Sequence, residues 1–201
     1  MDWHVLALSF GLIFPVELPD KTFVAALVLS TRYRPLAVWV GVGLAFGVQC
    51  LVAVSAGHAV SFLPEWVVHS LSTTMFLIGA IILFRAAPHA DDEEKEQEEE
   101  FAKKATRDQK GWHAVLASFL VLFAAEWGDL SQILTLNLVA KYGSPVSVFI
   151  GSWAALLTVS GLAVIGGRFL LRYMRLSVLH YVAGSVCLVF VALGITQLAI
   201  A

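Results

Sequence analysis

Four carboxylates lie at matched positions in the two halves of the sequence, each inside a long apolar stretch. Glu17 and Asp20 stand in "PVELPDKTF", and Glu126 and Asp129 stand in "AAEWGDLSQ". A charged side chain in an apolar membrane interior costs a few kcal/mol or more unless it is paired, hydrated or bound. Carboxylate oxygens bind protons and hard divalent cations, so these residues predict reversible binding of protons or of a cation.

The composition excludes an ordinary soluble fold. Of the 201 residues, 59% are hydrophobic and 14% are charged, and the mean hydropathy is +0.81. The charged residues gather in a few short tracts, as in helical proteins that cross a membrane several times. The first residues carry Asp2 and no Lys or Arg before Pro15, so we expect a retained first span and not a cleaved signal peptide.

Several apolar segments reach the length of about 20 residues that a helix needs to cross a bilayer. The six predicted spans are 4–30, 36–62, 67–86, 112–140, 146–171 and 178–200. Three precede the charged tract at 91–104 and three follow it. The predicted fold class is therefore all-α, with a three-helix unit at 1–87, an acidic linker at 88–111 and a second three-helix unit at 112–201.

The two units resemble each other in sequence. A shift of 109 residues places Glu17 on Glu126 and Asp20 on Asp129. Each unit has an odd number of spans, so the second must enter the membrane from the opposite side, which predicts two inverted repeats. Such folds bind substrate near the middle of the membrane, where helices are interrupted.

Prolines and a glycine predict these interruptions. Pro15 and Pro19 each remove a backbone donor from the first span, and Gly128 occupies the corresponding region of the fourth. We therefore expect helices 1 and 4 to be discontinuous or kinked.

The expected site contains only oxygen ligands. In a regular helix the two acids of each motif share a face, so the inverted copies would bring four carboxylates to one cavity. No His or Cys accompanies either motif, which favours a hard cation over Zn²⁺ or Cu⁺. The residues expected to add ligands or line the pathway are Thr22, Gln49, Ser131, Gln132 and Asn137.

Lys21 has no basic counterpart in the second motif, where Leu130 stands. It is either a salt-bridge partner of Asp20 or Glu17, or an internal cation that moves when metal binds. Both interpretations lower the negative charge of the site.

The basic residues predict the orientation. One side of the predicted layout has only Lys141, so the positive-inside rule places both termini outside and the linker in the cytoplasm. The linker is expected to be solvated and partly helical, or to concentrate cations at the inner mouth. The basic residues on the inner side are Arg32, Arg34, Arg85, Lys95, Lys103, Lys104, Arg107, Lys110, Arg168, Arg172 and Arg175.

The duplicated motif resembles that of the six-span manganese/calcium:proton exchangers of the Golgi and chloroplast type, formerly called uncharacterised protein family sixteen. Their motif is E-φ-G-D-(K/R)-(T/S) in spans one and four. This chain differs from it at Pro19, in place of Gly, and at Leu130, in place of Lys or Arg. The resemblance implies export of Mn²⁺, and in some members Ca²⁺, in exchange for protons. The ligands that it implies are Glu17, Asp20, Thr22, Glu126, Asp129, Ser131 and Gln132.

The leading hypothesis is a secondary transporter with alternating access, in a plasma membrane of the bacterial type. One alternative is an exporter of small amino acids or other organic solutes, which Lys21 supports. Another is a non-transporting scaffold in which the acids are buried salt bridges. No nucleophile–base pair or cofactor fingerprint indicates an enzyme, so we expect no resident cofactor and no nucleic-acid partner. The oligomeric state is left open.

Overall fold

The computed structural model describes residues 1–18, 21–104, 111–173 and 176–200, and these residues are helical apart from short turns. This confirms the predicted all-α fold class. The helices are α1 (Trp3–Glu17), α2 (Lys21–Arg32), α3 (Pro35–Val60), α4 (Glu65–Ala86), α5 (Ala90–Lys104), α6 (Trp112–Ala125), α7 (Leu130–Tyr142), α8 (Pro145–Tyr173) and α9 (Leu176–Ile200).

Local sequence signals explain where several helices begin and end. Asp2 caps α1, because its Oδ1 accepts hydrogen bonds from the backbone N–H groups of His4 at 2.9 Å and Val5 at 3.3 Å. Pro35 and Pro145 begin α3 and α8, at the position where the missing N–H has no helical partner. Gly143 ends α7 with a left-handed backbone, φ 62°.

The helices follow the predicted segments, but fewer of them qualify as spans on their own. Within the described residues, three stretches are long and apolar enough to cross a membrane: Pro35–Val60, Trp66–Ala86 and Pro145–Gly166. The pair α6 and α7 makes a fourth when it is counted as one broken span. The apolar stretches Trp3–Glu17, Thr22–Arg32 and His180–Thr196 are shorter. The layout of six spans therefore stays a prediction.

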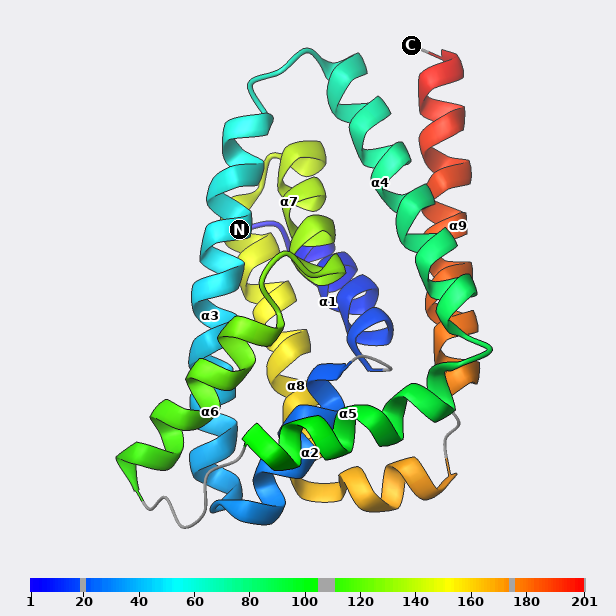
Figure 1. Cartoon of the computed structure of the whole chain (residues 1–201). Helices are drawn as coiled ribbons and strands as arrows, with labels where there is room; N and C mark the ends of the chain where they lie inside the picture. Colours follow the sequence, from blue (N-terminus) through cyan, green and yellow to red (C-terminus); the bar gives the residue numbers. More distant parts are fainter. Residues whose placement is uncertain (19–20, 105–110, 174–175, 201) are drawn as a thin grey trace.

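Helices α3 and α8 lie side by side at the centre, and α4 packs against α9 (Figure 1). Two tryptophans join the central pair. The Trp39 indole N–H donates to the carbonyl of Leu157 at 3.0 Å, and the Trp153 indole N–H donates to the carbonyl of Gly43 at 2.9 Å. From residue 39 to residue 43 along α3, the contacted residue of α8 changes from 157 to 153. The two helices therefore run antiparallel.

Two glycines let helices cross at backbone contact. A Cβ added at Gly41 of α3 would meet the carbonyl of Val115 and lie 2.9 Å from the Cβ of Ser118, both on α6. A Cβ added at Gly151 of α8 would meet the carbonyl of Leu6 and lie 2.9 Å from the Cβ of Ser9, both on α1. The sequence shift of 109 or 110 residues places Gly41 on Gly151 and Ser9 on Ser118. The α3–α6 and α8–α1 contacts therefore use matching residues from the two halves.

The acidic linker is helical in its first part. Helix α5 crosses the end of the molecule where α2 ends and α6 begins, opposite the C-terminus (Figure 1). Ala90 and Phe101 are buried, whereas Glu99 and Lys103 are exposed and lie 3.9 Å apart. One side of this charged helix is therefore packed and another is solvated. The division into two units and a linker stays a prediction.

Candidate functional site

Both candidate motifs lie where one helix ends and the next begins. Helix α1 ends at Glu17 and α2 begins at Lys21; α6 ends at Ala125 and α7 begins at Leu130, with a bend of 75°. The expected interruptions of spans one and four are therefore present. Pro15 lies inside α1, so the first helix continues past this proline and ends two residues later.

The second break lies between the two acids of its motif. Glu126 is the C-cap of α6 and Asp129 is the N-cap of α7, so their spacing crosses a break and is not one helical turn. The expectation that the two acids share a helix face was wrong for this motif. The same bend lies between Glu126 and Asn137, so these two residues do not share the face of one regular helix either.

The second break has a defined backbone geometry. Gly128 has φ 81°, in the left-handed region that glycine adopts without steric cost. Asp129 then begins α7, and its Oδ2 accepts a hydrogen bond from the N–H of Ser131 at 3.2 Å. One carboxylate oxygen of Asp129 thus stabilises the helix start.

Gln132 bridges this break with both ends of its side-chain amide. Its Nε2 donates to the carbonyl of Glu126 at 2.7 Å, and its Oε1 accepts from the N–H of Gly128 at 3.3 Å. A broken helix leaves backbone groups that must find partners inside a membrane. Gln132 supplies two of these partners, so its amide holds the backbone that carries Glu126. The corresponding position in the first half is Phe23.

The two glutamates are among the most deeply buried polar residues. Glu17 is 0% exposed and Glu126 is 2% exposed, each at the end of its helix. Helix α1 also contacts α7, which starts at the second break. A buried carboxylate is costly as an anion unless its charge is compensated, so both positions suit a group that takes up a cation or a proton.

The other neutral candidates are buried, whereas Gln132 is half-buried. Thr22 is fully buried, and its hydroxyl oxygen has no hydrogen-bond partner within the described part of the chain. Ser131 is buried at the first turn of α7. Gln49 Nε2 donates to the carbonyl of Phe123 at 3.2 Å, which ties α3 to α6 close to the second break.

Asn137 connects α7 to α4. Its Oδ1 accepts from the hydroxyl of Ser72 at 3.3 Å, and its Nδ2 donates to the carbonyl of Ile133 at 2.9 Å. These bonds assign the amide to helix packing. Ser72 has no distinguishing motif and was not identified from the sequence.

Some predicted site residues lie outside the described residues. These are Asp20 and the side chain of Lys21, and Pro19, which was predicted to interrupt the helix, lies outside the described residues as well. Among the residues described, no three His, Cys, Asp or Glu side chains form a group that could hold a metal ion. The site of four carboxylates therefore stays a prediction.

The structure also gives surroundings for two other residues, one inside the second motif and one close to the first. Leu130, which stands where the resembling family has a basic residue, has its methyl groups 3.0 and 3.5 Å from a Cβ added at Gly79 of α4. This departure from the motif thus contributes to apolar packing. Cys50, which the sequence analysis did not single out, is buried in α3 near Glu17. The sequence indicated this location only through the neighbouring Gln49, which was expected to line the pathway.

Comparison with known proteins gives matches along most of the chain. The family model described as divalent cation/proton antiporter GDT1 matches residues 5–91 and 114–199. The chloroplast protein PAM71 of Arabidopsis thaliana is 30% identical over 210 residues, which cover 96% of this chain and 56% of the relative. A GDT1-like protein of Synechocystis is 34% identical over 161 residues, which cover 76% of this chain and 78% of the relative.

The chloroplast relatives are longer than this chain. A GDT1-like chloroplast protein of Oryza sativa subsp. indica is 29% identical over 212 residues, covering 96% of this chain and 62% of the relative. The chain thus spans less than two thirds of the length of these relatives. No solved structure gives a significant match. The family match covers both halves and includes both helix breaks, so the chain belongs to the divalent cation/proton antiporter GDT1 family.

Proposed function

We propose that this protein exports a divalent cation in exchange for protons, with Mn²⁺ as the preferred substrate and Ca²⁺ as the second candidate. One observation carries the proposal: Glu17 and Glu126 occupy corresponding sequence positions and are buried, Glu17 as the last residue of α1 and Glu126 as the C-cap of α6. Together with Asp20 and Asp129 they are the proposed metal ligands. Membership of an antiporter family makes these acids candidates for transport and not for catalysis.

The donor atoms favour a hard cation. The proposed ligands are carboxylates, and buried hydroxyl residues, Thr22 and Ser131, follow each aspartate by two positions. Mn²⁺, Ca²⁺ and Mg²⁺ prefer such oxygen ligands, whereas Zn²⁺ and Cu⁺ recruit His or Cys. Mg²⁺ loses its water reluctantly, so a site buried from water favours Mn²⁺ or Ca²⁺.

Exchange follows from competition for the same oxygens. A carboxylate that has taken up a proton no longer ligates a metal, and a bound metal displaces the proton. The site therefore holds either the cation or protons, and one charge state replaces the other as the site changes its exposure. This shared neutralisation couples metal export to proton uptake without a separate proton pathway.

Alternating access fits an inverted repeat. The α3–α6 and α8–α1 crossings pair matching residues, Gly41 with Ser118 and Gly151 with Ser9, which supports two halves related by a twofold axis. Rocking one half against the other would expose the helix breaks to each side in turn. By the positive-inside rule the acidic linker faces the cytoplasm and both termini face outward, in a plasma membrane of the bacterial type.

The test is metal flux in proteoliposomes containing the full chain, with Mn²⁺ and Ca²⁺ compared under an imposed pH gradient. We expect proton-driven Mn²⁺ flux, and a loss of at least about tenfold in Glu17→Gln and Glu126→Gln, since even residues behind a metal's direct ligands have effects of this size. The control is Glu99→Gln, the same change on exposed α5. Wild-type flux in both site variants would overturn the assignment of the site.

A panel of amino acids in the same vesicles addresses the organic-solute alternative. Flux of an amino acid without any metal flux would exclude the proposed substrate. The scaffold alternative predicts that the two variants lose folding and that the wild-type protein carries no flux.

A further inference from the structure

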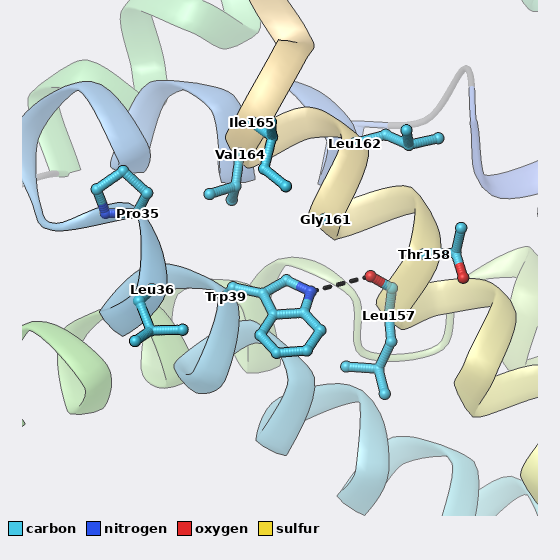
Figure 2. A pocket seen from close by; sticks show the side chains of 9 residues that line it. All are labelled: Pro35, Leu36, Trp39, Leu157, Thr158, Gly161, Leu162, Val164 and Ile165. Atoms are coloured by element: carbon cyan, nitrogen blue, oxygen red, sulfur yellow. Dashed lines mark hydrogen bonds between the residues drawn. The ribbon is translucent and has the colours of Figure 1, made fainter.

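An apolar groove lies between the start of α3 and the later part of α8. Figure 2 shows the Trp39 indole at its base, with its N–H directed to the carbonyl of Leu157. The cavity volume is about 610 Å³, within the range of sites that bind small molecules. The lining residues are Pro35, Leu36, Trp39, Leu157, Thr158, Gly161, Leu162, Val164 and Ile165.

The groove offers no free polar group that would bind a water-soluble ligand. The Thr158 hydroxyl donates to the carbonyl of Ala154 at 2.7 Å, and the Trp39 N–H donates to Leu157. Apolar side chains at the rim are open to the surroundings, with Leu36 70% exposed and Ile165 89% exposed. The chemistry of the lining therefore selects a hydrocarbon chain.

Gly161 lets the Trp39 indole pack closely against α8. A Cβ at this position would lie 3.3 Å from the Trp39 Nε1, which is closer than ordinary packing. The position that corresponds to Gly161 in the first half, at a shift of 110 residues, is Leu51. This close packing thus depends on a residue that the sequence repeat does not preserve.

The groove opens at one end of two membrane spans, where lipid headgroups lie. Pro35 is the first residue of α3, and the apolar stretch of α8 ends at Gly166. Arg34 directly precedes Pro35, and Arg32 lies in the last turn of α2; both are exposed. Basic residues beside a pocket between membrane helices attract anionic headgroups.

We propose that this groove binds an anionic phospholipid, with an acyl chain against Trp39 and Leu162 and the phosphate near Arg32 and Arg34. Along α8 the lining from residue 157 to residue 165 covers about 12 Å, at 1.5 Å per residue. This length accommodates part of an acyl chain. A lipid bound there packs against the contact that joins α3 to α8.

Native mass spectrometry of the purified full chain tests the proposal, with phosphatidylglycerol and phosphatidylcholine added at equal concentration. We expect phosphatidylglycerol adducts to dominate. Leu162→Trp fills the groove and should lower those adducts at least about fivefold, and Arg34→Gln should reduce the preference for phosphatidylglycerol by roughly the same factor. Val52→Trp is the matched control, since Val52 is the exposed counterpart of Leu162 in the first half.

Several outcomes would overturn the proposal. Equal retention of the two lipids by the wild-type chain would exclude headgroup selection, and undiminished phosphatidylglycerol adducts in Leu162→Trp would exclude the groove. A dimer that dissociates on Leu162→Trp, without lipid adducts, would assign the surface to a second copy. Arg34→Gln changes only an exposed residue, so it keeps the test valid if the groove-filling variant folds poorly.

Discussion

Glu17 and Glu126 end their helices at corresponding positions, but the residues around them differ. Gln132 bonds the backbone on both sides of the second break, while Phe23 stands at its counterpart in the first. The motif position that holds Lys21 in the first half holds Leu130 in the second, and Leu130 packs toward Gly79. The two halves of the proposed site therefore have similar acids in different surroundings.

Gln132→Leu tests the bridge at the second break. The substitution leaves the carbonyl of Glu126 and the N–H of Gly128 without these partners, and we expect a loss of about 1–3 kcal/mol in stability. Thermal unfolding in detergent measures the loss, and proteoliposome flux should fall with it. Gln97→Leu on α5 is the control. An unchanged unfolding temperature would show that the bridge contributes nothing.

Asp129 has two separable roles, as the cap of α7 and as a proposed ligand. Asparagine caps helices about as well as aspartate, so Asp129→Asn should unfold at a temperature close to wild type while its Mn²⁺ flux falls. Asp129→Ala should lose flux and also about 1 kcal/mol of stability. The two variants are compared by thermal unfolding and by flux. Wild-type flux in Asp129→Asn would remove this carboxylate from the ligand set.

At the scale of helices, the two close crossings hold the halves together. Both rest on a glycine facing the carbonyl of another helix, where even one methyl group has no space. Small residues allow such approach of membrane helices. The two broken helices, α1 and α6, are each held by the unbroken central helix of the other half.

Gly41→Ala and Gly151→Ala test these crossings. Each adds a Cβ against backbone, so both should destabilise by about 1–3 kcal/mol and by similar amounts. The matched control is Gly11→Ala in α1, where a Cβ meets nothing within 4 Å. Thermal unfolding of the three variants measures the effect. A control as unstable as the crossing variants would contradict this account of the packing.

At the scale of the whole molecule, the connections collect at two opposite ends. Helix α5, the end of α2 and the start of α6 lie at one end, and the connection of α3 to α4 lies near the C-terminus at the other (Figure 1). Basic residues concentrate in the loops of the first end, which we propose to be cytoplasmic.

Single cysteines test this orientation. Phe62→Cys is placed at an exposed residue between α3 and α4, and Glu99→Cys at an exposed residue of α5. The native Cys50 and Cys187 are buried, so their background labelling should be low. In intact cells a membrane-impermeant maleimide should label the first variant and not the second. The reverse pattern would invert the proposed topology.

The amino-acid sequence by itself determined the apolar segments, the acid pairs and their repetition. These features depend on the transfer energy of each segment into a membrane and on residue types at fixed spacing, which need no knowledge of remote contacts. The all-α fold and the interruption of both motif segments were therefore predictable. The family resemblance agreed with the later match to both halves of the chain.

Only the tertiary structure decided where the helices break and what each polar side chain contacts. The first break lies beyond Pro15, and the second separates Glu126 from Asp129, so these two acids do not share the face of one regular helix. Asn137 accepts a hydrogen bond from Ser72 of another helix, and Gly161 of α8 lets the Trp39 indole of α3 pack closely against it. Such features arise from contacts between residues distant in sequence, and a local pattern of residues does not specify them.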